Sequence, residues 1–370
     1  MIYLDNAATT PMSEKALKAY VDAARHVTGN PQSVHDSGAT AARLLEMCRD
    51  MLAKSMNGYS QGVIFTSGGT EANMLAIDSL LAAGKSRHVI ASQVEHASIR
   101  NYLRKLETCG YRVTFLPVDL NGVVSVEALR ASICQDTALV TIQLVNSEIG
   151  TIQPIKEISE ILKPKNIPFH IDAVQAFGKM PIDLQRLGVD ALSVSSHKLY
   201  GPKGVGICYL NPAIKRISPL EGTTHEMGFR PGTVNLPGIA AFAAAVEERL
   251  EVMEEELERV KKLRRRLLEK LEGLVWAEGS SNLALPHILG LTLPNMEGQL
   301  AMLKLSRQGI MVATGSACHV NLEEPSQTLT AIGKSAAEAK KFIRISFGKD
   351  TALEEVERVG DILRKLIIEK

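Results

Sequence analysis

Short apolar segments alternate with helical segments along most of the first 250 residues, and this alternation constrains the fold more than any other feature of the chain. Two helices come first, one from an N-cap at Ser13 to about residue 27 and one over residues 38–55. Apolar, β-prone runs and helical periods then follow one another, which is the pattern of a mostly parallel, doubly wound sheet with helices on both faces. The predicted strands are 63–66, 88–91, 112–116, 139–142, 169–171 and 191–194, with 206–210 returning antiparallel.

The character of the sequence changes after Gly238. Residues 239–274 have the pattern of one long helix, or of two nearly continuous ones. Short strands at 288–293, 311–312 and 342–345 then lie among helices, which is typical of a smaller α+β unit. We therefore predict a large α/β domain over residues 13–250 and a small α+β domain made of residues 1–12 and 251–370.

Charge and cysteine usage exclude several classes of function. The net charge of +1 gives no electrostatic footprint for nucleic acid or for an acidic membrane. The N-terminus lacks the pattern of a signal peptide, and no apolar run approaches the ~20 residues of a membrane span. The five cysteines are scattered without a Cys-x-x-Cys pair, so we expect free thiols, no metal site and a cytoplasmic protein.

A lysine at a predicted strand end is the first candidate for chemistry. The apolar run 191–194 stops at hydroxyl residues, and His197 and Lys198 precede a glycine–proline turn. A lysine held there with little bulk around it can form a Schiff base with a bound carbonyl, provided that its amine is partly deprotonated. An ordinary surface lysine is the alternative.

Two further strand ends supply groups that would complement such a lysine. Residues 67–71 form a glycine turn between a strand and a helix, which suits a phosphate dianion but is a weak signal alone. Asp172 follows the strand 169–171, at the edge where open α/β sheets bind ligands. It could cap a helix or pair with a cationic ring nitrogen. A phosphate cradle, a carboxylate and Lys198 together are what pyridoxal phosphate requires.

Three other residues stand out by their surroundings. His96 follows another strand end and is either a structural group or a ring-stacking proton carrier. Cys318 lies in a loop of small residues with no apolar face and is either a nucleophile or a surface thiol, whereas Cys48, Cys109, Cys134 and Cys208 are predicted to pack in the interior. Arg344, between apolar neighbours, calls for a carboxylate, from the protein or from a substrate.

Taken in order, these stretches resemble the cysteine desulfurases of the NifS/IscS kind, within fold type I of the pyridoxal-phosphate enzymes. The resemblance covers nearly the whole chain. The motifs that carry it are Leu4-Asp5-Asn6-Ala7-Ala8-Thr9-Thr10, Gly29-Asn30-Pro31, Gly68-Gly69-Thr70-Glu71-Ala72-Asn73, Val94-Glu95-His96, Asp172-Ala173-Val174-Gln175, Ser196-His197-Lys198-Leu199-Tyr200-Gly201-Pro202-Lys203-Gly204, Arg230-Pro231-Gly232-Thr233 and Gly315-Ser316-Ala317-Cys318.

The resemblance implies a role for each site residue. Lys198 would carry pyridoxal 5'-phosphate as a Schiff base and later move the α-proton of L-cysteine. The Cys318 thiolate would attack the substrate sulfur, leaving L-alanine and a persulfide that passes to an acceptor protein. The other implied roles are a ring-nitrogen partner (Asp172), a ring-hydroxyl donor (Gln175), phosphate ligands (Gly69, Thr70, Ser195 and His197), a phosphate ligand to the other subunit of a homodimer (Thr233), a ring-stacking group (His96) and a substrate carboxylate clamp (Asn146 and Arg344).

The segment that carries Cys318 resembles the long loop found in part of the family, which implies delivery of sulfur to several pathways, such as iron–sulfur cluster assembly or tRNA thiolation. Two features depart from the family pattern. His319 stands where a small hydroxyl residue is more usual, and the sequence stops at Lys370 without a clear tail for docking a scaffold protein. We therefore expect that the acceptor differs from the general scaffold or that His319 alters the choice of acceptor.

Two rival functions remain compatible with the residues. An aminotransferase or β-elimination lyase of the same fold would use the cofactor without needing Cys318. A catalytically weak member would act mainly as a binding platform or sulfur-relay partner, against which the intact set of Lys198, Asp172 and Cys318 argues.

Overall fold

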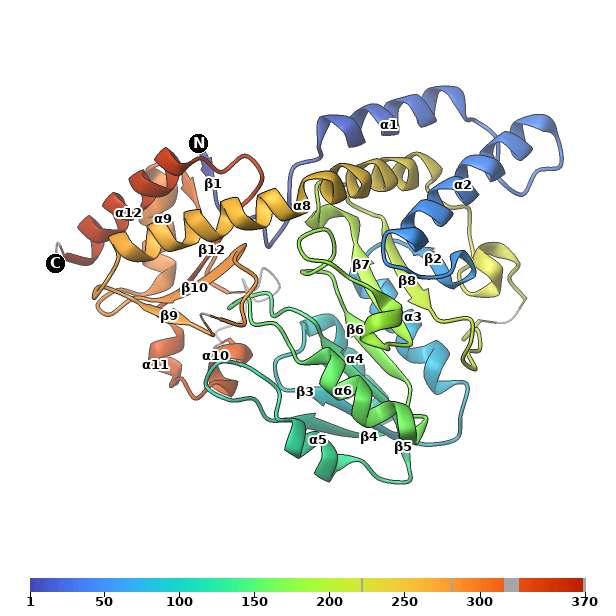
Figure 1. The fold of residues 1–370 in the computed structure, drawn as a ribbon, viewed down its shortest axis with the longest axis horizontal. Helices are drawn as coiled ribbons and strands as arrows, with labels where there is room; N and C mark the ends of the chain where they lie inside the picture. The colour runs from blue at the N-terminus through green and yellow to red at the C-terminus, as the bar shows by residue number, and fades with distance from the viewer. Residues whose placement is uncertain (221, 281, 316–325, 369–370) are drawn as a thin grey trace.

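In the computed structural model, a seven-stranded sheet forms the centre of the molecule (Figure 1). The structure describes residues 1–220, 222–280, 282–315 and 326–368. The strands are β1 (Ile2–Tyr3), β2 (Val63–Thr66), β3 (His88–Ser92), β4 (Arg112–Leu116), β5 (Thr137–Gln143), β6 (Phe169–Asp172), β7 (Ala191–Ser195), β8 (Gly206–Leu210), β9 (Trp276–Glu278), β10 (Ile288–Thr292), β11 (Ile310–Met311) and β12 (Phe342–Ser346).

Helices cover both faces of this sheet, and further helices lie in the C-terminal part of the molecule. The helices are α1 (Glu14–His26), α2 (Asp36–Lys54), α3 (Gly69–Leu81), α4 (Ala97–Thr108), α5 (Val126–Ser132), α6 (Ile155–Leu162), α7 (Leu184–Leu187), α8 (Leu236–Lys270), α9 (Gly298–Arg307), α10 (Gln327–Ala331), α11 (Ala336–Ala339) and α12 (Leu353–Ile368). Four 3₁₀ turns interrupt the connections in the described residues, namely η1 (Ser60–Gly62), η2 (Lys163–Lys165), η3 (Ser196–Lys198) and η4 (His225–Gly228).

The large sheet has the strand order β2-β8-β7-β6-β5-β3-β4. Within it β8 pairs antiparallel with β2 and β7, and the other pairings are parallel, so the doubly wound prediction and the antiparallel return are confirmed. Successive residues point to opposite faces, as Ile64 and Phe65 of β2 show by joining different hydrophobic clusters. Because both faces are covered by helices, the strands are apolar almost throughout.

The long helix α8 links two separate hydrophobic clusters. Its first part packs with α1 and α2 against the sheet, and its last part packs with β10, β12, α9 and α12 in what we call the C-terminal cluster (Figure 1). The helix begins before Gly238, earlier than the sequence predicts, because the Asn235 side chain caps it and Pro237 is tolerated in its first turn. The boundary predicted near residue 250 falls inside this continuous helix, and the division into domains there stays a prediction.

The N-terminal segment runs from the C-terminal cluster to the large sheet. β1 pairs parallel with β11, and Leu4 is buried in the C-terminal cluster. Ala7 belongs to the other hydrophobic cluster, which the first part of α8 shares with the large sheet. This segment therefore spans both hydrophobic clusters within a few residues.

Two details of the sequence analysis are wrong. Strand β9 was not predicted, because Trp276 and Ala277 are exposed and the strand therefore lacks the pattern of buried apolar residues that predicts a strand. Cys48 and Cys208 are buried as predicted, but Cys109 and Cys134 are exposed, since both follow the last turn of a helix where the chain reaches the surface. Within the described part of the chain, no helix combines the length and the apolar run needed to cross a membrane.

Candidate active site

A cavity of about 250 Å³ opens at the carboxyl edge of the large sheet. Loops that follow β2, β3, β5, β6 and β7 contribute to it, together with the N-terminal segment and β12. Most of the residues predicted for the site line it, namely Gly69, Thr70, His96, Asp172, Gln175, Ser195, His197, Lys198 and Arg344. The cavity therefore brings together residues that are far apart in the sequence.

The glycine turn between β2 and α3 forms one end of the cavity. Gly68 has φ +149°, a conformation that side-chain-bearing residues rarely adopt, and a Cβ on Gly69 would lie 2.8 Å from the Val174 side chain. The first turn of α3 is thus brought close to the loop after β6. Its free backbone N–H groups face a second hollow lined by Gly68, Gly69 and Thr70.

Side chains from β7 and η3 complete an anion-binding cradle at this end. The Ser195 hydroxyl is buried and has no hydrogen-bond partner among the described residues. His197 lies beside it, with Nδ1 3.1 Å from the Thr9 hydroxyl. Burial and the nearby lysines lower the pKa of His197 to about 4, so its ring is neutral at physiological pH and can donate one hydrogen bond. An oxyanion would satisfy the orphaned hydroxyl.

Asp172 ends β6 and is held in place on both carboxylate oxygens. Oδ2 accepts a hydrogen bond from Asn73 Nδ2 at 2.9 Å, and Oδ1 accepts one from the Val174 N–H at 2.9 Å. Both contacts fix the orientation of the carboxylate. The arrangement suits a carboxylate that pairs with a positively charged ligand atom.

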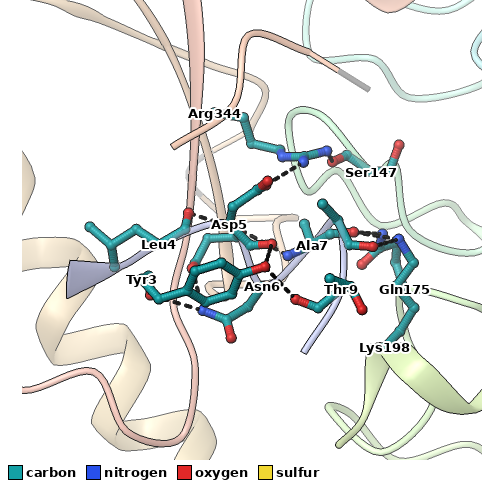
Figure 2. Close-up of polar contacts among 12 residues, drawn as sticks. Tyr3, Leu4, Asp5, Asn6, Ala7, Thr9, Ser147, Gln175, Lys198 and Arg344 are labelled. Atoms are coloured by element: carbon teal, nitrogen blue, oxygen red, sulfur yellow. Dashed lines mark hydrogen bonds and ion pairs between the residues drawn. The ribbon is translucent and has the colours of Figure 1, made fainter. Parts of the chain in front are cut away.

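Lys198 extends from η3 toward the N-terminal segment (Figure 2). Its Nζ donates to the backbone carbonyl oxygens of Ala7 at 2.6 Å and Ala8 at 2.8 Å. Gln175 Nε2 donates to the same Ala7 oxygen at 2.9 Å. Both of these lysine acceptors are neutral carbonyl groups, which a bound ligand can replace more easily than a carboxylate.

Arg344 forms the opposite end of the cavity, and Figure 2 shows it reaching toward Asp5 and Ser147. One terminal nitrogen pairs with Asp5 Oδ1 at 2.8 Å, and the other donates to the Ser147 carbonyl oxygen at 3.0 Å. Its Nε is buried and has no partner among the described residues. The guanidinium is thus oriented by the protein and keeps donor capacity for a second carboxylate.

His96 caps the N-terminus of α4 and borders the cavity at the same time. Its Nδ1 accepts the Ser98 N–H at 3.1 Å and lies 2.8 Å from the Ser98 hydroxyl. Since Nδ1 accepts, the ring proton of the neutral form is on Nε2. His96 therefore has a structural role as the cap of α4 and also lines the cavity where a ligand would bind.

Two of the predicted site residues that the structure describes, Asn146 and Thr233, do not line the cavity. Asn146 is buried behind it, where its amide bonds the backbone of Val94, Glu148 and Ile149 and the hydroxyl of Thr328. Thr233 is exposed at the surface, which leaves its predicted contact with another subunit as a prediction. Cys318 lies outside the described residues, and so does its neighbour His319.

Sequence reasoning gave no role to several groups that build the site. Asn73 and the carbonyl groups of Ala7 and Ala8 lie inside motifs that carry the resemblance, but only the folded chain shows what they contact. Ser98 and Ser147 lie outside those motifs. No feature of the sequence alone singles out a backbone carbonyl as a lysine partner.

Comparison with known proteins shows the family to which the chain belongs. The model of the aminotransferase class-V family matches residues 2–359, so the chain is a member of that family. A curated relative from Bacillus subtilis (strain 168), named putative cysteine desulfurase NifS, is 46% identical over 97% of this chain and 93% of its own length. With further relatives named cysteine desulfurase IscS, this shows that the chain belongs to the NifS/IscS cysteine desulfurases.

Solved structures give the same result. The structure of a NIFS-like protein superposes with a TM-score of 0.91 at 34% identity, covering 98% of this chain and 99% of the other. The structure of SspA in complex with cysteine has a TM-score of 0.82 at 31% identity, covering 94% of this chain and 99% of the other. Recognition of the family and the fold type I architecture are therefore confirmed.

Enzymes of this family depend on pyridoxal 5'-phosphate, and the residues of the cavity fit that group. The orphaned Ser195 hydroxyl and the turn at Gly69 suit its phosphate. The donor-held carboxylate of Asp172 suits its ring nitrogen, and the Lys198 amine suits its carbonyl. An anion cradle, a carboxylate and an amine thus surround one cavity.

Proposed function

We propose that this chain uses pyridoxal 5'-phosphate to remove sulfur from L-cysteine, giving L-alanine and a persulfide on Cys318. The observation that carries the proposal is the cavity at which the Lys198 amine, the Asp172 carboxylate and the Ser195 hydroxyl meet. Family membership supports the reaction, and the similarity to SspA, whose structure was solved in complex with cysteine, supports the substrate.

The cofactor, when bound, acts as an electron sink that weakens bonds to the substrate α-carbon. Asp172, oriented by Asn73 and the Val174 N–H, would hold a proton at the ring nitrogen. Thr70, Ser195 and His197, with the backbone at Gly69, would bind the phosphate. Arg344 would orient the substrate carboxylate, and the Lys198 amine would carry the proton that leaves the substrate α-carbon.

The thiolate of Cys318 would take the sulfur. Its Sγ forms a bond to the substrate sulfur while the substrate C–S bond breaks, and the electron pair of that bond stays with the substrate carbon, which is then protonated. The products are L-alanine and a Cys318 persulfide. The persulfide sulfur would pass to an acceptor thiol, in iron–sulfur cluster assembly or in tRNA thiolation.

We also propose a cytoplasmic homodimer. The exposed position of Thr233, away from the cavity of its own chain, supports a contact with the cofactor phosphate of a second copy. Five cysteines with no paired motif support a reducing compartment. Size-exclusion chromatography with light scattering measures the mass of the protein in solution and so tests the dimer. A monomeric mass would contradict it.

The reaction is tested by measuring alanine and sulfide release from L-cysteine with and without a reductant. Wild type is compared with Cys318→Ala and, as a matched control, with Cys134→Ala, which removes an exposed thiol elsewhere on the surface. We expect activity to be lost only in Cys318→Ala. Mass spectrometry after a non-reducing pulse should find one added sulfur on the peptide that contains Cys318.

The same experiment separates the rival functions. Undiminished alanine or pyruvate formation in Cys318→Ala would favour an aminotransferase or lyase over a desulfurase. Absence of a visible cofactor band near 400 nm, roughly the region of a pyridoxal Schiff base, would favour a binding or relay protein.

A further inference from the structure

A second lysine lies directly behind the cavity wall. Lys179 is only 7% exposed, and its Nζ donates to Gln175 Oε1 at 3.2 Å. It does not line the active-site cavity itself. Instead it borders a small enclosed space with Asn6, Tyr200, Arg249 and His287.

Lys179 and the N-terminal segment together determine how the Gln175 amide is oriented. A lysine amine presents its N–H groups to the glutamine oxygen, whereas the Ala7 carbonyl can only accept from the glutamine nitrogen. The two contacts therefore require Oε1 to face Lys179 and Nε2 to face Ala7. Nε2 has a second hydrogen, and Gln175 lines the cavity, so this hydrogen is available to an acceptor on a bound ligand.

The same contacts join the two lysines in one hydrogen-bond chain. Lys179 donates to Gln175, Gln175 donates to the Ala7 oxygen, and Lys198 donates to that same oxygen (Figure 2 shows the last two contacts). A change at Lys179 thus reaches the Lys198 region through one side chain and one carbonyl.

The charges around Lys179 do not explain its burial. Among the described residues, the charged groups that act most on it are Lys198, Arg249 and Arg344, all of its own sign, and the neutral ring of His287 borders the same space. Burial and these cations lower the pKa of Lys179 to about 7. Either protonation state retains N–H groups for Gln175. An apolar side chain of similar length would avoid the cost of burying the amine, so stability of the fold alone does not account for it.

We propose that Lys179 is a positioning residue that holds the Gln175 amide with its N–H groups toward the cavity, ready to donate to the ring hydroxyl oxygen of pyridoxal phosphate. This inference rests on the proposed function, because it presupposes that the cavity binds the cofactor. It assigns Lys179 no contact with the substrate or with the reacting atoms.

The test uses the full-length protein and the variants Lys179→Met and Gln175→Leu, singly and combined. Cofactor affinity is measured by reconstituting each apo-protein with pyridoxal phosphate, and the pH midpoint of the visible absorption of the bound cofactor is measured separately. We expect Lys179→Met to raise the dissociation constant about tenfold, the effect of one lost hydrogen bond. We expect the midpoint to move to higher pH, because loss of a nearby donor and cation favours the protonated form.

The double variant distinguishes positioning from general damage. If Lys179 acts through Gln175, adding Lys179→Met to Gln175→Leu should change the dissociation constant by no more than about twofold. Additive effects, or an unchanged dissociation constant and midpoint in Lys179→Met, would overturn the proposal. Arg264→Met is the matched control, since Arg264 is another buried cation that bonds a backbone carbonyl and lies outside the cavity. It should leave both cofactor readouts unchanged.

Folding of each apo-protein is monitored by circular dichroism and thermal unfolding. We expect Lys179→Met to be at least as stable as wild type without cofactor. Lys179→Gln, which keeps a polar donor, is the second variant, and failure of both to fold would overturn the proposal by assigning Lys179 to the fold. If wild type itself binds no cofactor, the proposed function fails, which is a different outcome from a normal wild type with unaffected Lys179 variants.

Discussion

Two titratable side chains beside the cavity are neutral near pH 7 because they are buried. Glu95, next to His96, is fully enclosed, and burial together with the nearby Asp172 raises its pKa to about 8, against the hydrogen bonds from Ser92 and the Gln143 N–H. Burial lowers the pKa of His197 to about 4. Glu95 and His197 therefore add no charge beside Asp172 and Lys198 near pH 7.

Glu95→Gln should change how stability depends on pH. The folded pKa of Glu95 is above its unfolded value, so the protonated form stabilises the fold below pH ~4.5, and this contribution is lost as pH rises toward about 8. Glutamine cannot ionise, so the variant should gain on wild type by up to ~1.4 kcal/mol per pH unit over that range. Urea unfolding at several pH values between 5 and 8 measures the difference. A constant difference would contradict an elevated pKa.

Arg344→Lys should weaken substrate binding more than catalysis. Lysine keeps the positive charge but lacks the planar guanidinium group, which contacts Asp5 and Ser147 and has a further N–H donor at Nε. We expect KM for L-cysteine to rise about tenfold with a smaller change in kcat, as expected when about 1.4 kcal/mol of binding is removed. Steady-state kinetics checks this, with Arg216→Lys, whose side chain bonds Leu210 and Gln61 carbonyls elsewhere, as the control.

At the scale of single residues, the sequence predicts which side chains line the cavity better than it predicts how they are held. Lys198, Asp172 and Ser195 lie at strand ends, and the carboxyl ends of parallel strands meet at one edge. The partners Asn73, Ala7 and Lys179 depend on which elements become neighbours, and a linear pattern does not contain that information. Cys318 stands out in the sequence because small residues surround it, but it lies outside the residues that the structure describes.

At the scale of elements, a buried ion pair ties the surface segment that carries Thr233 to the sheet. Arg49 of α2 pairs with Glu226 of η4 through both terminal nitrogens at 2.9 Å, and the same carboxylate accepts the Phe65 N–H of β2 at 2.7 Å. Both side chains are almost completely buried. The pair therefore joins a helix, a strand and a 3₁₀ turn at one point.

Glu226→Ala should destabilise the protein by about 3–5 kcal/mol, because it removes the buried partner of the Arg49 charge, which then pairs only with the largely exposed Glu46 carboxylate. Chemical denaturation measures this. Glu160→Ala, which removes an exposed partner of Lys156, is the control and should cost less than ~1 kcal/mol. A Glu226→Ala variant as stable as the control would show that the pair contributes nothing to the fold.

Strand positions were predictable because a buried parallel strand is a short apolar run with polar ends, as in β6 and β7. The start of α1 was predictable because the Ser13 side chain caps it. The strand β9 was missed because an exposed strand has no alternation of apolar and polar residues. The first turn of α8 was missed because Pro237 is usually a sign that a helix is interrupted, although here Asn235 caps the helix just before it.

At the scale of the whole molecule, α8 is the longest continuous element that joins the sheet to the C-terminal cluster. Its buried residues run to Arg249 and resume at Glu256. The exposed stretch between them packs against neither cluster. The stiffness of the helix there transmits the orientation of one part of the molecule to the other.

Glu254→Pro should break this link. Proline in a helix interior costs about 3 kcal/mol or more, and the break falls where no packing compensates for it. Calorimetry should show two separated transitions in place of one, whereas Glu254→Ala, at the same exposed position, should unfold as wild type does. A single sharp transition in Glu254→Pro would mean that other contacts couple the two parts.

The N-terminal segment adds a second and much shorter connection between the two hydrophobic clusters. The Leu4 N–H is bonded to the Met311 carbonyl oxygen beside the C-terminal cluster, and three residues later the Ala7 oxygen receives Lys198 and Gln175. Residues 5–8 form a turn in which the Ala8 N–H bonds the Asp5 carbonyl oxygen, and the Ala7 N–H donates to the Ser346 hydroxyl of β12 at 2.9 Å. A hinge movement of the C-terminal elements away from the sheet would pull the Ala7 carbonyl with it. The carbonyl oxygen that accepts the Lys198 amine is thereby coupled to the position of β12 relative to the large sheet.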